Sequence, residues 1–294
     1  MLKAVIDTGA NSVKLVLLKK ENGKFIRVLN KLEITRLAED LDKNKIFKLE
    51  AMKRTLSVLL EFVETAKKEG AEEIKLLGMA AFRKAENRAE FIEEIKNATG
   101  LTLRVLTGGE EARLGLIGIA RTLDMDNFVL LDIGGGSIEL CAKSGEEEFL
   151  KSIPIGAVNL YENFIKNEPP SVEERFAVED YVREKIGTHP NFLNFSLIGV
   201  GGTITTIADM IMGLSEFDTD KTHLYKMKYD DLKKLNDKLW KMPLPERKKI
   251  TGLHPQRADV IITGASIIQV VMEVLKKDTL IVSVVNLVEG VLYE

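Results

Sequence analysis

The residues best suited to chemistry in this sequence occur in two copies of one short pattern. The stretch KAVIDTGANSVKL begins at residue 3, and FVLLDIGGGSIEL returns 125 positions later. In each copy an apolar strand ends at an aspartate, Asp7 or Asp132, and small residues follow. The backbone N–H groups of such a turn can converge on an anion, and a carboxylate is a good ligand for a hard cation. Each copy is therefore suited to bind phosphate and a divalent metal.

Within the two copies, glycines permit the close backbone approach that a phosphate oxygen requires. The candidate phosphate-binding residues are Gly9, Asn11, Ser12, Gly134, Gly135, Gly136 and Ser137. The alternative is a pair of ordinary tight hairpin turns, since Asp, Gly and Asn are common in turns. Two copies with matching flanks favour the phosphate site. Asp7, Asp132 and Glu139 are candidate metal ligands. The alternative for Glu139 is that it is simply an exposed residue of its strand.

A second acidic position lies in the segment TGGEEARLG, where Glu110 and Glu111 follow a glycine pair at the expected start of a helix. Negative charge at a helix N-terminus is stabilising, so a capping role is one reading. A carboxylate placed just before the second glycine loop could also orient and deprotonate an attacking water. Position alone leaves both readings open.

Further candidate anion contacts come from arginines and a third glycine loop. Arg83 follows a strand end, and its forked guanidinium suits a bidentate phosphate contact, although a solvated surface arginine is the alternative. Arg36 is similar, and Arg257 could cap the apolar helix that it precedes or bind anions there. The loop GVGGTITT, which contains Gly201, Gly202 and Thr203, opens another helix and is a third candidate anion site.

Bulk properties narrow the class of protein. The chain has 294 residues, of which 45% are hydrophobic and 30% charged, with a net charge of -3 and a pI near 5.9. These values argue against a nucleic-acid binder with a broad basic field, although a local basic cleft stays open. No signal peptide or bilayer-spanning stretch is visible, and one cysteine, Cys141, cannot form an internal disulfide. We expect a cytoplasmic protein with no membrane or nucleic-acid partner.

The hydrophobic pattern predicts two related halves of an α/β fold. In the first half we expect three strands, a helix over 49–68, a strand over 74–79, a helix over 87–98, a strand over 102–106 and a helix over 110–122. The pattern restarts at residue 127. We therefore assign an N-terminal lobe to residues 1–123 and a C-terminal lobe to 124–294. The last helix, about 286–294, is a candidate to cross back to the first lobe.

Eight motifs taken in order resemble the exopolyphosphatase / guanosine pentaphosphate phosphohydrolase family. They are DTGANSVKL, RLAEDL, AAFRKAEN, TGGEEARLG, DIGGGSIEL, PIGAVNL, GVGGTITT and GLHPQRADVIITG. The resemblance implies the actin-like, sugar-kinase and chaperone-ATPase fold (ribonuclease H-like), with phosphates and Mg²⁺ in a cleft between two lobes. It also implies that Glu111 is the catalytic base, with Glu110 as the second choice, and that Arg83 binds phosphate. Asp132 and Glu139 then organise the metal and water.

The activity that the resemblance implies is Mg²⁺- or Mn²⁺-dependent release of the terminal phosphate from inorganic polyphosphate, or of the 5′-phosphate from guanosine pentaphosphate, a nucleotide of the stringent response. A homodimer is one candidate assembly, and guanosine tetraphosphate a further nucleotide partner. Two alternatives are an actin-like sugar kinase or ATPase and a non-catalytic alarmone sensor. The chain departs from the family at Ala10, where a serine is usual, and at Lys14, where an arginine is common.

Overall fold

The chain forms two compact units. The structure, a computed structural model, describes all 294 residues. Unit 1 comprises Met1–Asp124 and Leu287–Glu294, and unit 2 comprises Met125–Asn286. No helix has both the length and the apolar character needed to cross a membrane.

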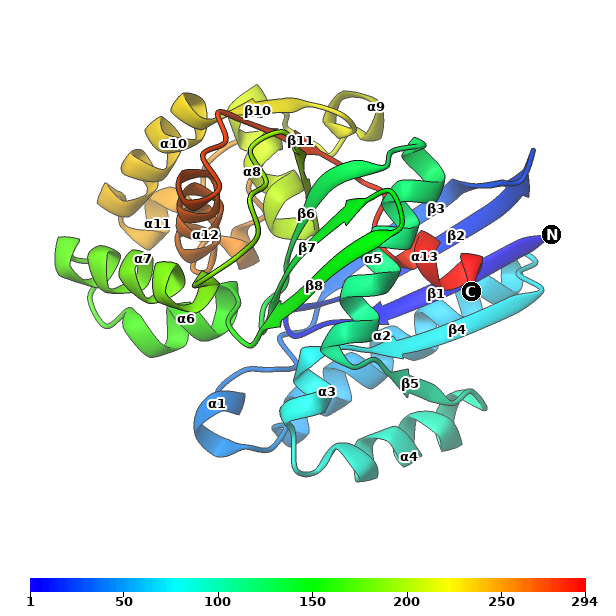
Figure 1. Cartoon of the computed structure of the whole chain (residues 1–294). Helices are drawn as coiled ribbons and strands as arrows, with labels where there is room; N and C mark the ends of the chain where they lie inside the picture. Colours follow the sequence, from blue (N-terminus) through cyan, green and yellow to red (C-terminus); the bar gives the residue numbers. More distant parts are fainter. The chain divides into compact units, whose positions relative to one another are not determined.

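Unit 1 is built on a five-stranded sheet with the order β3-β2-β1-β4-β5 (Figure 1). The pairs β1–β2 and β2–β3 are antiparallel, whereas β1–β4 and β4–β5 are parallel. The antiparallel strands β1, β2 and β3 thus form one half of the sheet. Strand-helix-strand connections lead to β4 and β5, which form the other half. The strands are β1 (Leu2–Thr8), β2 (Ser12–Glu21), β3 (Lys24–Ile34), β4 (Glu73–Gly78) and β5 (Leu103–Val105).

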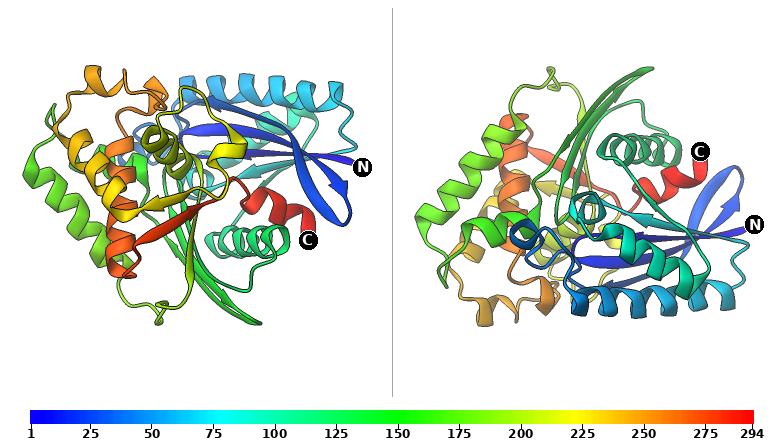
Figure 2. Two further views of the ribbon diagram at one scale, coloured as in Figure 1. Left: turned by 90° about the horizontal axis from the view of Figure 1, so that it is seen from above. Right: turned by 90° about the horizontal axis from the view of Figure 1, so that it is seen from below.

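Helices cover both faces of this sheet (Figure 2). The long helix α2 (Leu49–Lys68) buries an apolar stripe that includes Leu59 and Phe62 in one core cluster. On the opposite face, α5 (Gly108–Leu123) and α13 (Leu287–Tyr293) enclose a second cluster with Val5, Val16 and Leu18. Coverage on both faces explains why β1 reads as a nearly continuous apolar run. The remaining helices of unit 1 are α1 (Leu41–Asn44), α3 (Ala80–Lys84) and α4 (Arg88–Thr99).

The last helix, α13, belongs to the core of unit 1. A side chain at Gly290 would collide with the carbonyl oxygen of Leu114 on α5, so only glycine permits this approach of the two helices. The carboxylate of Glu289 is completely buried and forms a two-point ion pair with Arg27 of β3. A buried carboxylate needs such a partner, because an uncompensated charge inside a protein is costly.

Unit 2 repeats the sheet of unit 1. Its order is β10-β11-β9-β6-β7-β8, with β6–β7 and β7–β8 antiparallel and β6–β9 and β9–β11 parallel. Five strands therefore match those of unit 1 in order and direction, and β10 adds an antiparallel edge strand. The strands are β6 (Asn127–Ile133), β7 (Ile138–Ser144), β8 (Glu147–Ile153), β9 (Ser196–Val200), β10 (Lys226–Lys228) and β11 (Thr279–Val282). The short repeat in the sequence is thus part of a repeat of whole sheets.

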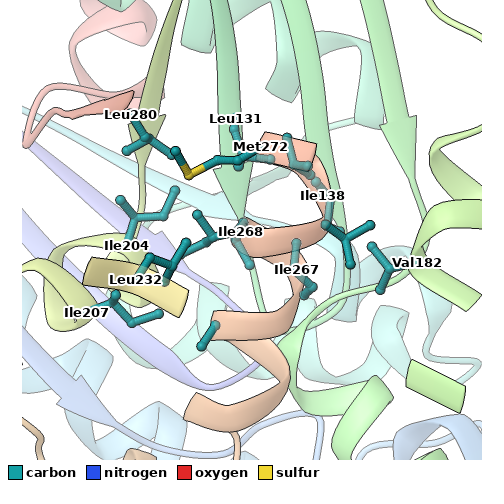
Figure 3. Packing of buried hydrophobic residues seen from close by; sticks show 14 of the residues in the cluster. Leu131, Ile138, Val182, Ile204, Ile207, Leu232, Ile267, Ile268, Met272 and Leu280 are labelled. Atoms are coloured by element: carbon teal, nitrogen blue, oxygen red, sulfur yellow. The ribbon is translucent and has the colours of Figure 1, made fainter. Parts of the chain in front are cut away.

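The core of unit 2 is organised around the apolar helix α12 (Ile261–Val274). Figure 3 shows Ile268 and Met272 of this helix among side chains from the sheet, such as Leu280, and from neighbouring helices, such as Leu232. The helix is buried almost all round, which accounts for the most apolar stretch of the chain. The other helices are α6 (Ala157–Phe164), α7 (Val172–Ile186), α8 (Gly202–Met212), α9 (Thr219–Thr222), α10 (Tyr229–Lys241) and α11 (Leu244–Arg247), with a 3₁₀ turn at Pro255–Arg257.

The elements expected from the sequence are present. The predicted helix over 49–68 has the observed bounds of α2. The pattern missed α3, a five-residue helix between β4 and α4. Short helices make few periodic contacts, so hydrophobic spacing gives little indication of them. This omission matters, because α3 carries Arg83.

Candidate functional site

In unit 1, the loop between β1 and β2 is fixed by the segment that follows β3. Thr35 and Arg36 donate backbone hydrogen bonds to the Asn11 carbonyl at 3.0 and 2.9 Å, and the Ala38 amide donates to the Ala10 carbonyl at 2.9 Å. Arg36 adopts a left-handed φ of 50° there, which a non-glycine residue rarely does. In a trans peptide the carbonyl and the next amide point in opposite directions. The amides of Asn11 and Ser12 therefore face away from this segment.

In unit 2, the matching loop between β6 and β7 is held by the N-terminus of α6. The amides of Ala157 and Val158 donate to the carbonyls of Gly134 and Gly135, each at 3.0 Å. By the same peptide geometry, the amides of Gly135 and Gly136 face away from α6. The loop thus presents donors on one side, as a phosphate site requires.

The residue that allows this arrangement is Gly156, in the PIGAVNL motif. A Cβ at this position would lie 2.5 Å from the backbone of both Gly135 and Gly136. Asn159 completes the contact, since its Oδ1 accepts from the Gly156 amide at 2.7 Å and its Nδ2 donates to the Gly136 carbonyl at 3.4 Å. Sequence reasoning quoted the motif without giving these two residues a role, because only the fold brings them to the loop.

Next to this loop, Asp132 and Glu139 are directly opposite each other on β6 and β7. Cross-strand partners of this kind point to the same face of the sheet. Glu139 is 2% exposed and accepts a hydrogen bond from Ser152 at 2.9 Å, so the alternative of an exposed strand residue is wrong, while its role as a metal ligand stays a prediction. A Cβ on Gly201 would lie 2.7 Å from Asp132 Oδ1. The Asp132 carboxylate therefore lies against the loop that opens α8.

The third glycine loop lies next to a half-buried arginine, Arg257. Arg257 Nη1 donates to the Gly202 carbonyl at 2.7 Å and to Thr206 Oγ1 at 2.9 Å. No carboxylate pairs with this guanidinium, and burial lowers the pKa of Arg257 to about 10. A half-buried, partly desolvated cation without a counterion favours an anion, and Arg257 lies beside the N-terminus of α8, where Gly202 and Thr203 begin the helix. The sequence had left Arg257 open between capping and anion binding.

In unit 1, Arg83 and Glu111 form an ion pair. Arg83 Nη1 donates to Glu111 Oε2 at 2.7 Å and to the Leu106 carbonyl at 2.8 Å. The Arg83 side chain is 24% exposed, so it is not a solvated surface arginine. Glu111 lies in the first turn of α5 and is buried. Burial raises the pKa of Glu111, and the nearby Arg83 charge opposes that increase.

Asp7 is electrostatically coupled to the same pair. Burial is the main reason that the pKa of Asp7 rises to about 7, with the charge of Glu111 adding to the increase and Lys14 opposing it. Lys14 is the cross-strand partner of Asp7 on β2. Asp7 Oδ1 is buried and accepts no hydrogen bond. A buried acceptor without a partner is rare, and it indicates a site for water or a cation.

Glu110, the neighbour of Glu111, has a different environment. Its carboxylate accepts from the Thr107 amide at 2.8 Å while Thr107 Oγ1 accepts from the Glu110 amide, a capping box at the start of α5. Arg104 also pairs with it at 2.8 Å, and chiefly for this reason the pKa of Glu110 falls to about 2. Glu110 therefore caps the helix, whereas Glu111 is the buried residue of the two.

The structure contains no group of three or more His, Cys, Asp or Glu residues close enough to hold a metal ion. The donors nevertheless suit a hard cation. Asp7 offers an oxygen without a partner, and Asp132 and Glu139 offer two carboxylates on one face of a sheet. Mg²⁺ prefers oxygen ligands and keeps several of its waters, so one or two carboxylates are enough to hold it.

Comparison with known proteins places these residues in a family context. The sequence model of the Ppx/GppA phosphatase family matches residues 16–294, which begins just after the first loop. A bifunctional 3-dehydroquinate synthase/phosphatase of Fusobacterium nucleatum is 35% identical, over 96% of this chain and 45% of that protein. Exopolyphosphatase 2 of Mycobacterium tuberculosis is 29% identical, over 98% and 96%. The guanosine-5′-triphosphate,3′-diphosphate pyrophosphatase of Vibrio campbellii is 28% identical, over 100% and 59%.

The chain therefore spans less than half of the Fusobacterium protein and about three fifths of the Vibrio protein. Among solved structures, the Aquifex aeolicus member of the Ppx/GppA family matches with a TM-score of 0.82 and 32% identity, over 99% of this chain and 96% of that one. An exopolyphosphatase from Cytophaga hutchinsonii matches with a TM-score of 0.90 and 25% identity, over 100% and 97%. These matches confirm the resemblance indicated by the eight motifs, and the fold is the α/β, actin-like type that it implied.

Proposed function

Because this chain belongs to the Ppx/GppA phosphatase family, we propose that it is a phosphohydrolase that releases the terminal phosphate of inorganic polyphosphate or the 5′-phosphate of guanosine pentaphosphate. One observation carries the proposal: buried Glu111 is held by Arg83 and coupled to the partnerless oxygen of Asp7. A raised carboxylate pKa next to a phosphate loop suits a general base that works near neutral pH.

Glu111 is the residue that accepts the proton of the attacking water in this proposal. Its Oε2 is occupied by Arg83, which fixes the side chain and leaves Oε1 for the water. Glu110 is unsuitable, because its pKa of about 2 makes it a weak base and its oxygens are engaged in the helix cap. General-base assistance is typically worth about 10²–10⁴ in rate.

The glycine loops and arginines would hold the phosphates. A terminal phosphoryl group reacts through a loose transition state, so catalysis consists largely of positioning and charge stabilisation. The amides of Asn11 and Ser12 in unit 1 and of Gly135 and Gly136 in unit 2 supply neutral donors that are already oriented. Arg257 supplies a charge that no carboxylate of the protein neutralises. Further candidate phosphate contacts are Arg36 in unit 1 and, in unit 2, Gly201, Gly202 and Thr203, which lie beside Asp132 and Arg257.

We propose Mg²⁺ or Mn²⁺ as the cofactor; the candidate ligands are Asp7 in unit 1 and, considered separately, Asp132 and Glu139 in unit 2. When bound, such an ion neutralises negative charge on the transferred phosphoryl group. Asp7 supports this assignment, since a cation would satisfy its buried oxygen. We also propose that the protein acts in the cytoplasm, in agreement with its single reduced thiol at Cys141.

The test is phosphate release from long-chain polyphosphate and from guanosine pentaphosphate, each with Mg²⁺ and with excess chelator. We expect release from at least one substrate, with loss of activity in chelator and recovery when Mg²⁺ is restored. No release from either substrate at any metal concentration would refute the proposed activity. Release that continues after exhaustive chelation would refute the metal requirement alone. ATP with a mixture of sugars serves as the control for a kinase, which the comparisons do not favour.

A further inference from the structure

One stretch of unit 2 has a charge opposite to that of the whole chain. Residues 226–249 contain nine Lys and Arg against four Asp and Glu, a net charge of +5, whereas the complete chain has a net charge of -3. The stretch covers β10, α10 and α11. These two helices lie next to each other in unit 2, as Figure 1 shows. A charge asymmetry of this size points to a partner of the opposite sign.

Three lysines follow one another along one side of α10, which also carries Asp230, Asp231 and Asp237. Lys234, Lys238 and Lys241 are spaced at i, i+4 and i+7, so they follow one another along a single helix face. All three are exposed, while the opposite face buries Leu232 and Leu239 in the core. Lys248 and Lys249, at the end of α11, are also exposed. We call these five lysines the basic surface.

Four of the five lysines have no ion-pair partner. Lys238, Lys241, Lys248 and Lys249 pair with no carboxylate, and Lys234 reaches Asp231 only at 4.0 Å. Elsewhere on the same helix Lys233 pairs with Asp237 at 3.0 Å. Lysines near a helix C-terminus offset the helix dipole, which explains Lys241. That explanation does not extend to Lys248 and Lys249, because they follow α11, a helix of only four residues.

The aromatic residues of the stretch decide between two polyanions. Proteins that bind single-stranded nucleic acid combine a basic groove with exposed aromatic rings on which bases stack. The two aromatic residues here are engaged elsewhere: Trp240 is buried and donates to Ser266 at 3.0 Å, and the Tyr229 hydroxyl donates to Glu273 at 2.8 Å. The basic surface offers charge without a stacking platform. It suits a linear polyanion that has no bases.

We propose that the basic surface binds the distal part of an inorganic polyphosphate chain, an assignment that rests on the proposed function. Lys249 is eight residues from Arg257, so at most about 28 Å of extended backbone separates the basic surface from the third glycine loop. A long polyphosphate chain bound at that loop is long enough to reach the basic surface as well. The basic surface therefore increases affinity for long chains and has no effect on short ones.

The experiment replaces Lys238, Lys241, Lys248 and Lys249 together by Gln. Binding of long-chain polyphosphate and of tripolyphosphate is measured as a function of salt, on a Glu111→Gln background that prevents turnover. A matched control replaces four exposed, unpaired lysines of unit 1 by Gln: Lys31, Lys45, Lys67 and Lys96. Because all eight lysines are exposed, both variants should fold, and circular dichroism checks this.

We expect the affinity of the test variant for long chains to fall about tenfold at low salt, with tripolyphosphate unaffected and the control unchanged. The slope of log affinity against log salt should decrease in magnitude by about 3, as for four lost phosphate contacts on a single strand. Equal affinities of test and control variants for long chains would overturn the proposal. Displacement of bound polyphosphate by single-stranded RNA of equal charge would overturn the choice of occupant.

Hydrolysis by the unmodified protein separates this inference from the proposed function. If the protein binds long chains through the basic surface but releases no phosphate from any substrate, the proposed function fails and the surface stands. If it hydrolyses polyphosphate while the four lysines make no difference to binding, the surface fails and the proposed function stands.

Discussion

The two hairpins that open the units have the same backbone but opposite electrostatics. In each, an aspartate ends the first strand, and the glycine that starts the loop donates to the serine at its end, Gly9 to Ser12 and Gly134 to Ser137, both at 3.0 Å. The cross-strand partner of the aspartate differs. Asp7 is opposite Lys14, whereas Asp132 is opposite Glu139.

This difference teaches how one repeated scaffold can be given two tasks. In unit 1, Lys14 partly offsets the effect of Glu111 on Asp7, and the carboxyl has a pKa of about 7. In unit 2, two carboxylates face each other, an arrangement that like-charge repulsion disfavours unless a cation is present. We infer that unit 1 supplies the base and unit 2 the stronger metal site. The predictions below test this division, from the largest expected effect to the smallest.

The largest effect should come from the base. Glu111→Gln preserves size and the contact with Arg83 but cannot accept a proton, so the hydrolysis rate should fall about 10²–10⁴-fold with substrate affinity within a few-fold. Glu110→Gln is the matched control, since glutamine also completes a capping box. Steady-state kinetics on both substrates measures the two variants. Full activity of Glu111→Gln would show that Glu111 is not the base. Loss of activity in Glu110→Gln alone would assign the base to Glu110 instead.

An effect on stability should follow at Asp7. A carboxyl whose pKa is raised by folding favours the protonated form, so its contribution to stability is complete below pH 3.8 and is lost as pH rises to about 7. Without divalent metal, Asp7→Asn should therefore increase the free energy of unfolding at pH 8 by up to about 4 kcal/mol, and change it little at pH 4.

Urea unfolding of the metal-free protein at the two pH values measures this effect. Asp126→Asn, a change at an exposed acid of unit 2, is the control and should shift neither value. The hydrolysis rate of Asp7→Asn should fall, since the variant loses a metal ligand. A lower stability of Asp7→Asn at pH 8 would mean that the buried carboxylate has a partner that offsets its burial.

The smallest effects concern the two cross-strand partners, Glu139 and Lys14. Their replacement should shift the half-saturating Mg²⁺ concentration in opposite directions. Glu139→Gln removes a negative charge beside Asp132 and should raise the half-saturating Mg²⁺ concentration about tenfold. Lys14→Gln removes a positive charge beside Asp7 and should lower it slightly. Titration of activity with Mg²⁺ compares them. Shifts in the same direction for both variants would contradict the division of tasks between the hairpins.

The sequence predicted the features that adjacent residues form. It did not predict the contacts between residues that only the fold brings together. The two loops and their strands were predicted because strand, turn and strand are adjacent and the pattern occurs twice. The ion pair of Arg83 with Glu111 was not predicted, since its partners are 28 positions apart on separate helices. The role of Gly156 was missed for the same reason: its motif lies after β8, and only the sheet brings it to the glycine loop. The sequence did favour Glu111 over Glu110, but through family resemblance rather than burial.

The ion pair between Arg27 and Glu289 and the contact of Gly290 with α5 have a consequence for synthesis on the ribosome. Most of unit 1 precedes unit 2 in the sequence, yet unit 1 needs Leu287–Tyr293 to close one face of its sheet. Unit 2 is continuous and is complete in the nascent chain before that helix is made. Unit 1 therefore begins to appear first but completes its core last. Until Glu289 has been made, Arg27 lacks its buried counterion.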